Sequence, residues 1–295
     1  MKLIKTLKSR DGKTIKYLQK TRDNYIIETG YFNLDEHIIC ISTQIGCPMN
    51  CLFCSAGKKL NMPGNTKPFI RNLTVKEIVK QVENIILSLQ KQNKLKSKMI
   101  LFSYLGVGEP FLNYKNVVQS VKVLTKKFPN SRVTISTVGV KPELIKKLAR
   151  EKINTVLKLH LSLHSPNDIL RRKLLPNAKK IKPVLNALKY FSKIKNVSAK
   201  VNYVLIDNVN DSPKLAEQLA KLLKHYSFTA KLSILNDHNF IGLKPSSEKR
   251  IKIFEKILNS HGIKTCRFYP NGTDIKASCG QLRIYLPQFG SGRVS

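Results

Sequence analysis

The sequence has few acidic residues, few cysteines and no long apolar run. Its 295 residues include 18 Asp and Glu against 53 Lys and Arg, so the formal net charge is +35. No apolar stretch approaches the roughly 20 residues of a membrane-spanning helix, which excludes an integral membrane protein. The charged N-terminal segment MKLIKTLKSR has no apolar stretch after it, so we expect no secretory signal. We therefore expect a cytoplasmic protein.

Six cysteines are too few for a disulfide-stabilised scaffold in a chain of this length. In a cytoplasmic protein they indicate metal ligands or catalytic thiols instead. A hydrophobic content of 42% excludes a wholly disordered chain, and the length is ample for a sizeable core. We find no internal repeat and no linker-like segment.

The excess of positive charge indicates a polyanionic partner, most simply a nucleic acid bound through its phosphates. A general lysine bias of the source proteome would give the same composition, because lysines supply most of the charge. A role at a membrane surface needs a basic amphipathic helix with bulky aromatic residues on its apolar face, and we see no clear case.

Short apolar runs alternate with helical patterns along most of the chain, which indicates parallel β/α units. The expected strands are 38–45, 99–105, 132–137, 155–163, 198–206 and 229–235. The expected helices are 74–93, 114–127, 141–151, 181–193, 213–225 and 246–260. Thr74 with Glu77 forms a capping-box pattern, and Ser212 with Pro213 reads as an N-cap followed by the first helical position. Six units fall short of the eight of a closed barrel, so we expect a partial (β/α)6 barrel or an open α/β sheet.

We expect three regions along the chain. Residues 1–37 form an N-terminal extension that contains a β-hairpin over 13–32, with its turn at TRDN. Residues 38–285 form the α/β domain, and 286–295 form a flexible tail. The longest polar loop is expected at 57–72.

Three closely spaced cysteines follow the first apolar strand. Cys47, Cys51 and Cys54 have the spacing C-x3-C-x2-C, with Phe53 before the last. Such thiolates can converge on one iron–sulfur cluster, and three ligands leave one iron of a four-iron cluster open to a small molecule. Zinc is the alternative, but structural zinc takes four ligands and no nearby Cys or His pair supplies the fourth in ordinary spacing.

Polar and glycine-rich segments follow the later strands. Gly106-Val107-Gly108-Glu109-Pro110 follows the second strand, where a glycine-rich turn allows close backbone approach and a carboxylate can pair with an ammonium group. Ser136 ends the third strand, Ser162-Leu163-His164 ends the fourth, and Asn236 ends the sixth. An α/β barrel builds its site from such positions, although each alone is also compatible with ordinary turn chemistry.

The cysteine motif resembles that of the radical S-adenosylmethionine (radical SAM) superfamily. Further segments resemble the RlmN/Cfr family of RNA adenine methyltransferases within it, over about residues 24–282. They are Cys40-Ile-Ser-Thr-Gln-Ile-Gly-Cys47, Arg71-Asn-Leu-Thr-Val75, Leu163-His-Ser-Pro-Asn-Asp168, Val209-Asn-Asp211 and Asp274-Ile-Lys-Ala-Ser-Cys-Gly-Gln-Leu282.

The resemblance implies a partial (β/α)6 radical SAM barrel with an N-terminal β-hairpin extension. It also implies one [4Fe-4S] cluster on the three cysteines, and SAM bound at its open iron. The SAM-contacting positions carried over from the family are Gly108, Glu109, Ser136, Ser162, Leu163, His164 and Asn236. An electron donor such as flavodoxin or ferredoxin, an RNA substrate (rRNA, tRNA or both) and a monomeric state follow from the same resemblance.

The resemblance also assigns catalytic residues. Cys279 matches the cysteine that the family methylates with a first SAM, and a second SAM gives the radical that takes hydrogen from this S-methyl group. The carbon radical then adds to an adenine carbon, with C2 favoured over C8. Cys40 matches the cysteine that resolves the protein–RNA crosslink by forming a disulfide with Cys279. Glu28 matches, with a one-residue gap, the glutamate that accepts the proton.

The sequence departs from the family pattern in several places. The segment Leu235-Asn-Asp-His-Asn-Phe240 stands where the family has Trp-Asn-Pro-Phe-Pro, and the loop after Cys54 is longer than usual. Only about 20 residues precede the segment that resembles the family, so the N-terminal accessory domain of the family is expected to be missing, and the high charge could replace it in RNA binding. Val107 stands where the family has Met. A radical SAM enzyme for a peptide or small molecule remains an alternative, as does a non-catalytic RNA-binding protein. Cys40 and Cys279 disfavour the first, and the intact cysteine triple disfavours the second.

Overall fold

Seven parallel strands form the centre of the sheet, in the order β4-β7-β8-β9-β10-β11-β12. The computed structural model describes residues 1–58, 67–95, 98–236, 242–278 and 280–282. The seven strands are β4 (His37–Cys40), β7 (Ile100–Tyr104), β8 (Ser131–Thr137), β9 (Leu157–Ser162), β10 (Lys200–Leu205), β11 (Thr229–Ile234) and β12 (Thr265–Phe268). The predicted alternation is confirmed, and β12 adds a strand beyond the six that the sequence analysis expects.

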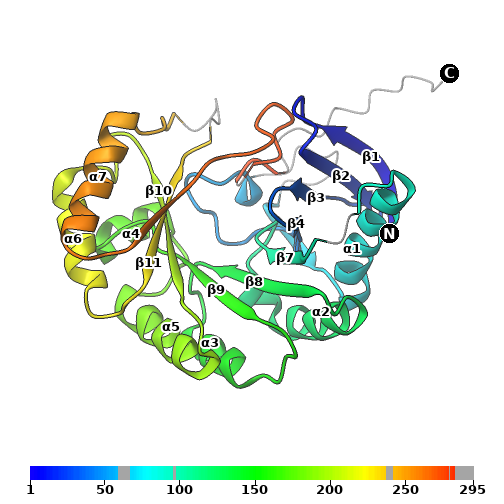
Figure 1. Cartoon of the computed structure of the whole chain (residues 1–295), viewed down its shortest axis with the longest axis horizontal. Coiled ribbons are helices and arrows are strands. Elements are labelled where there is room, and N and C mark those ends of the chain that lie inside the picture. The colour runs from blue at the N-terminus through cyan, green and yellow to red at the C-terminus, as the bar shows by residue number, and fades with distance from the viewer. Residues whose placement is uncertain (59–66, 96–97, 237–241, 279, 283–295) are drawn as a thin grey trace.

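Three antiparallel strands extend the sheet at the β4 edge, in the order β1-β2-β3-β4. They are β1 (Lys2–Lys8), β2 (Thr14–Lys20) and β3 (Ile26–Asn33). The β2–β3 pair is the predicted hairpin, with Thr14 opposite Phe32 and Lys20 opposite Ile26. The hairpin therefore belongs to the same ten-stranded sheet as the parallel strands, at the right of Figure 1.

A second, two-stranded sheet pairs β5 (Gln44–Gly46) with β6 (Phe69–Asn72). The expectation of a continuous polar loop over 57–72 is therefore wrong at its C-terminal end. The run FIRN has too few alternating residues to stand out as a strand, and its pairing with β5 is a long-range contact.

Helices lie on the outer side of the curved sheet (Figure 1). They are α1 (Val75–Lys91), α2 (Tyr114–Lys127), α3 (Pro142–Arg150), α5 (Ile181–Lys195), α6 (Pro213–Leu223) and α7 (Glu248–Ser260). The short helix α4 (Asp168–Leu174) packs beside the loop that carries the three motif cysteines, and the 3-10 turns are η1 (Ser55–Gly57) and η2 (Pro110–Asn113). The capping box of Thr74 and Glu77 is confirmed, as is the Ser212 cap before Pro213. The short helix α4 is not among the expected helices.

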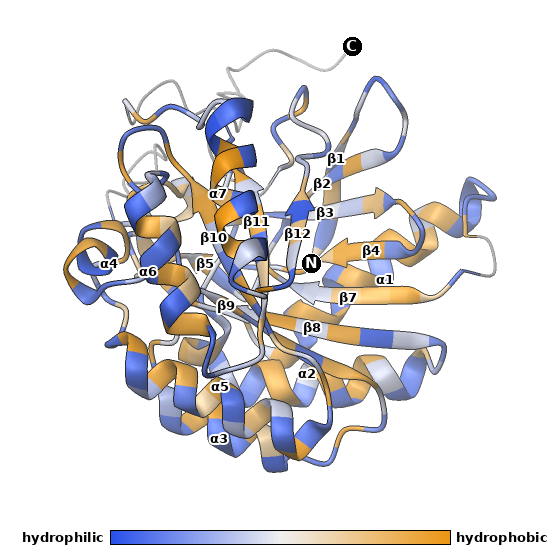
Figure 2. Ribbon diagram, turned by 60° about the vertical axis from the view of Figure 1, so that its left-hand side comes forward, coloured by the Kyte–Doolittle hydropathy of each residue, from blue (hydrophilic) through white to orange (hydrophobic). Residues whose placement is uncertain are grey.

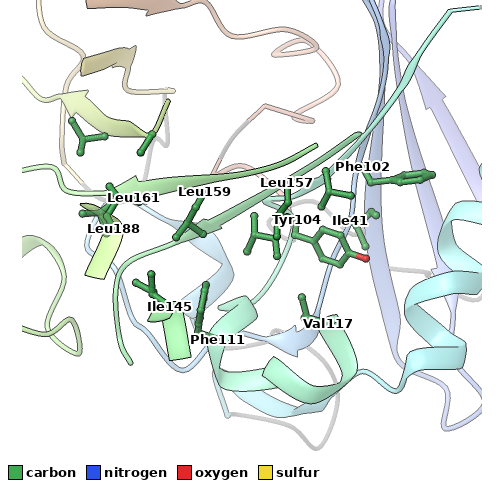
Figure 3. Packing of buried hydrophobic residues seen from close by; sticks show 14 of the residues in the cluster. Ile41, Phe102, Tyr104, Phe111, Val117, Ile145, Leu157, Leu159, Leu161 and Leu188 are labelled. Atoms are coloured by element: carbon green, nitrogen blue, oxygen red, sulfur yellow. The ribbon is translucent and has the colours of Figure 1, made fainter. Parts of the chain in front are cut away.

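The main core lies between the outer face of the sheet and the helices. The longer helices present apolar stripes to the sheet, and the strands are largely apolar (Figure 2). Figure 3 shows this layer around β7, β8 and β9, where Phe102, Tyr104, Leu157 and Leu159 meet Val117 of α2 and other helical residues. Full burial of each such side chain contributes about 1.5–3 kcal/mol to folding.

The opposite, inner face of the sheet carries a second set of side chains. Strand register places Lys16, Gly30, Cys40 and Ser103 in one row across β2, β3, β4 and β7. Paired residues of neighbouring strands project to the same face, so this row is interior throughout. Many of the inner side chains are polar, which sets this face apart from the apolar helix side.

Candidate active site

The inner face of the sheet encloses a cavity of about 290 Å³. Its wall is formed by the inward residues of the strands and by the loops after β5, β7, β8, β9 and β11. Among the residues singled out from the sequence, those lining it are Cys40, Cys47, Cys51, Cys54, Gly108, Glu109, Ser136, Ser162, His164 and Asn236. Positions spread over almost two hundred residues of sequence therefore meet around one space.

The three motif cysteines lie in the loop after β5 and contribute to the cavity wall. The loop is fixed by backbone bonds, because the Cys47 amide donates to Pro68 (3.0 Å) and the Leu52 amide to Leu174 (2.9 Å). Burial raises the pKa of the Cys51 thiol, and the neighbouring Cys54 and Cys47 raise it further because thiolates repel one another. Three thiolates at this spacing therefore need a positively charged partner.

Within the described residues, no three His, Cys, Asp or Glu side chains are grouped as ligands of one metal ion. A four-iron cluster is larger than an ion and takes each thiolate at a different iron, so three cysteines spread around a cavity wall suit it. No disulfide bond joins two cysteines of the described part of the chain.

Glu109 is a buried carboxylate that joins the ends of β7 and β8. Its Oε1 accepts hydrogen bonds from the Thr137 hydroxyl (2.7 Å) and the Phe111 amide (3.0 Å), and its Oε2 accepts one from the Val138 amide (2.9 Å). Burial raises the pKa of the Glu109 carboxyl, while these hydrogen bonds act in the opposite direction. The carboxylate is thereby held rigidly at the cavity wall, where it can pair with an ammonium group.

The glycines before Glu109 allow close backbone approach. A Cβ on Gly106 would lie 2.7 Å from the Ile41 carbonyl carbon. Gly108 has φ +111°, which a side chain rarely adopts, and its Cβ would lie 2.6 Å from the Thr43 hydroxyl. The β7 loop therefore packs against the segment between β4 and β5 with no room for side chains.

His164 lies beneath the cysteine loop as a neutral imidazole. The Val204 amide donates to its Nδ1 at 3.0 Å, so the ring proton is on Nε2. Burial, together with the charge of Arg171, lowers the pKa of His164 to about 3. The ring of Phe53 packs edge-on against it, with centroids 4.8 Å apart.

Two buried polar atoms at the cavity wall, Ser136 Oγ and Asn202 Oδ1, have no hydrogen-bond partner within the described residues. A buried polar atom without a partner costs about 1–3 kcal/mol, so such atoms indicate a polar ligand. The amino, carboxylate, ribose and adenine groups of SAM supply both donors and acceptors. The cavity residues thus fit SAM next to a cluster. The sequence does not single out Asn202 as a site residue, because an asparagine within a strand belongs to no recognisable motif.

Three predicted site residues are placed differently from the rest. Leu163 is fully buried in the main core and does not line the cavity, because it points to the opposite face from Ser162 and His164. Glu28 is also outside the cavity wall and is buried beside Lys16. Cys279 lies outside the described residues, although its neighbours Ser278 and Gly280 line the cavity.

Arg171 of α4 is a site component that the sequence analysis misses. The residue is 2% exposed, and its guanidinium donates to the carbonyls of Val138 (2.6 Å), Ser162 (3.2 Å), Leu163 (3.2 Å) and Lys179 (2.6 Å). It therefore joins the ends of β8 and β9. The only signal in the sequence is one arginine in a basic stretch.

Comparison with known proteins shows to which enzyme family the chain belongs. The family model of the radical SAM superfamily matches residues 41–220. The probable dual-specificity RNA methyltransferase RlmN of Thermotoga maritima is 40% identical over 291 residues, covering 96% of this chain and 80% of that protein. The chain belongs to the RlmN family of radical SAM enzymes. The dual-specificity RNA methyltransferase RlmN of Wigglesworthia glossinidia brevipalpis is 39% identical, covering 93% of this chain and 71% of that protein.

The fold agrees with this membership. The crystal structure of a radical SAM methyltransferase from Sphaerobacter thermophilus has a TM-score of 0.86 and 35% identity, over 95% of this chain and 80% of that chain. Membership of the RlmN family implies a [4Fe-4S] cluster and SAM, as the sequence analysis expects. Within the described residues, no helix has the length and apolar character needed to cross a membrane.

Proposed function

We propose that this RlmN-family enzyme methylates C2 of an adenine in rRNA, tRNA or both, through a methyl group carried on Cys279. The observation that supports this most is the convergence of the three cluster cysteines, Cys40 and both neighbours of Cys279 on one cavity. The RlmN relatives are named RNA methyltransferases, and the net charge of +35 suits an RNA substrate.

Cys47, Cys51 and Cys54 would hold the cluster, and Glu109 would pair with the ammonium group of SAM. Ser136, Ser162, His164, Asn236 and the backbone around Gly108 would contact the rest of SAM. When bound, the cluster supplies the electron that cleaves SAM to a 5′-deoxyadenosyl radical.

The remaining steps belong to residues of the chain. The Cys279 sulfur takes a methyl group from a first SAM, forming a carbon–sulfur bond as S-adenosylhomocysteine leaves. After hydrogen is removed from this methyl group, its carbon bonds to the adenine C2. The adduct radical gives up one electron, which the oxidised cluster would take back, and Glu28 accepts the proton that C2 loses. The Cys40 thiolate then attacks the Cys279 sulfur, a disulfide forms, and the released methylene carbon takes up a proton to give the methyl group of the RNA. Cys40 suits this role because it lies on the inner face.

We propose that the enzyme works in the cytoplasm and takes its electron from a low-potential donor such as flavodoxin or ferredoxin. We propose a monomer, because the described residues form one cavity without a second copy.

The test is an anaerobic assay of the reconstituted enzyme with methyl-labelled SAM, a reductant and RNA. We expect label on Cys279 and then on an adenine carbon, both detected by mass spectrometry. Cys279→Ala should retain the cluster and form 5′-deoxyadenosine but give no methylated RNA, whereas the Cys266→Ala control should behave like the wild type. Methylated RNA from Cys279→Ala would refute the methyl-cysteine route, and adenine methylated at C8 would refute the choice of carbon.

A further inference from the structure

A buried ion pair lies on the inner face of the sheet, next to Cys40. The Lys16 ammonium is 3.4 Å from the Glu28 carboxylate, and the two side chains are 0% and 2% exposed. Lys16 pairs with Gly30, which pairs with Cys40, and Glu28 precedes Gly30 by two residues on the same strand. Lys16, Glu28 and Cys40 therefore project to one face. Buried ion pairs are costly to form and are weak evidence for stability, so this pair calls for another explanation.

Lys16 also contacts the segment that leads to Cys279. Its Nζ donates to the Lys276 carbonyl at 3.2 Å. Lys276 has φ +52°, a left-handed conformation that is uncommon for residues other than glycine. The hydrogen bond from Lys16 thus stabilises an unfavourable turn three residues before Cys279.

The same segment contacts the start of the hairpin and the turn that precedes it. The Arg10 amide donates to the Asp274 carboxylate at 2.9 Å. Gly272 has φ +67°, and a Cβ there would lie 2.5 Å from the Thr14 side chain. The turn at 272–276 is therefore packed directly against the hairpin.

After Cys279 the chain is bound to the cluster loop. The Ser55 amide donates to the Gly280 carbonyl at 3.0 Å, and the Ser55 hydroxyl donates to the Leu282 carbonyl at 2.9 Å. Ser55 directly follows the cluster cysteine Cys54. The chain is thus held on both sides of Cys279, by Lys16 before it and by Ser55 after it.

We propose that Lys16 is a positioning residue that couples Glu28 to the loop carrying Cys279. Its ammonium fixes the Glu28 carboxyl group in place on the inner face and holds the loop at Lys276. This inference rests on the proposed function for the roles of Glu28 and Cys279. Lys16 itself touches neither SAM nor RNA in this scheme.

The first test measures the loop without any activity assay. Lys16→Met removes the ammonium but keeps a side chain of similar length. By hydrogen–deuterium exchange on the full chain, we expect the amides of Lys276 and Ala277, which bond to Thr273 and Gly272, to exchange about tenfold faster or more. Strand β9 should be unchanged, and so should the whole Lys20→Met variant, since Lys20 is an exposed lysine of the same strand. Unchanged exchange in the loop of Lys16→Met would overturn the proposal.

The second test separates coupling from a merely structural role. Methylation of Cys279 depends only on the loop, whereas methylation of RNA depends on both the loop and Glu28. In Lys16→Met we therefore expect RNA methylation to fall at least tenfold more than Cys279 methylation, and Lys16→Arg to restore much of the loss. Equal losses in the two steps, or no restoration by arginine, would overturn the coupling.

Lys16→Met leaves the buried Glu28 carboxylate without this ammonium, which could prevent folding. A last variant keeps the proposal testable in that case. Lys16→Met/Glu28→Gln removes both charges, and its loop should still exchange faster than that of Glu28→Gln alone. A failure of the proposed function would give a different result. The wild type would then carry no label on Cys279 or RNA, but the loop of Lys16→Met would still exchange faster than that of the wild type. Equal loop exchange in Glu28→Gln and the double variant would overturn the positioning role.

Discussion

Replacing Arg171 by methionine should destabilise the protein strongly. The guanidinium donates four hydrogen bonds to backbone carbonyls in the interior. Methionine fills much of the same volume but donates nothing, so these carbonyls lose their partner. Each buried acceptor left without a donor costs about 1–3 kcal/mol.

The net loss is smaller than the four carbonyls alone suggest. At about 2 kcal/mol each, the middle of that range, four carbonyls without donors would lower the free energy of unfolding by about 8 kcal/mol. Burial lowers the pKa of Arg171 to about 10, which means that the folded state bears a penalty for its charge. At about 1.4 kcal/mol per pKa unit, removal of the charge returns about 3 kcal/mol. We therefore expect the free energy of unfolding to fall by about 3–5 kcal/mol, the lower value applying where water reaches a carbonyl.

Urea denaturation of the full chain, followed by circular dichroism, measures this loss. The neighbouring Arg172 is exposed, so Arg172→Met is a matched control that should change stability by less than about 0.5 kcal/mol. SAM affinity should also fall in Arg171→Met, because Val138 and Ser162 mark the strand ends that Arg171 joins. A loss below about 1 kcal/mol in Arg171→Met would refute the reasoning, since the four bonds would then contribute little.

Two further predictions concern His160 and Cys51, which both line the cavity. Burial lowers the pKa of His160 to about 3, with nearby lysines adding to the effect, so the folded state keeps this ring neutral while the unfolded chain binds a proton below about pH 6.5. Stability should therefore fall as pH drops from 6.5 towards 3. The free energy of unfolding, measured by urea denaturation, should fall between pH 7 and pH 5 by about 2 kcal/mol less in His160→Gln than in the wild type. His225 is exposed, so the free energy of unfolding of the His225→Gln control should fall as much as that of the wild type. The same fall in all three proteins would contradict the burial argument. After reconstitution, Cys51→Ser should lose most of the bound iron and of the iron–sulfur absorbance, whereas the Cys266→Ser control on β12 should retain both. Full iron content in Cys51→Ser would contradict the assignment of Cys51 as a ligand.

Local sequence signals predicted much of the backbone. The helix expected at 114–127 is α2, Tyr114–Lys127, and the capping box at Thr74 starts α1 as expected. These features depend on the period of apolar residues and on side chains that bond to nearby backbone groups, so a short window of sequence contains the information. The cysteine motif is local in the same way.

Long-range pairing decided what the sequence analysis missed or misplaced. β6 exists because β5 pairs with it, and Leu163, directly after β9, faces the core because it continues the alternation of that strand. The contact of Lys16 with Glu28 and Lys276 joins three segments across 260 residues. No local pattern marks a lysine in a strand as buried, because its burial depends on which loop covers it.

The sequence by itself determined the alternation of strands and helices, the cluster motif and the family. Only the tertiary structure decided which of the expected residues share the cavity, and that Lys16, Ser55 and Arg171 hold the surrounding backbone. The physical reason is that a motif specifies chemistry within a few residues, whereas a buried charge or carbonyl is satisfied by whichever distant segment the fold brings to it.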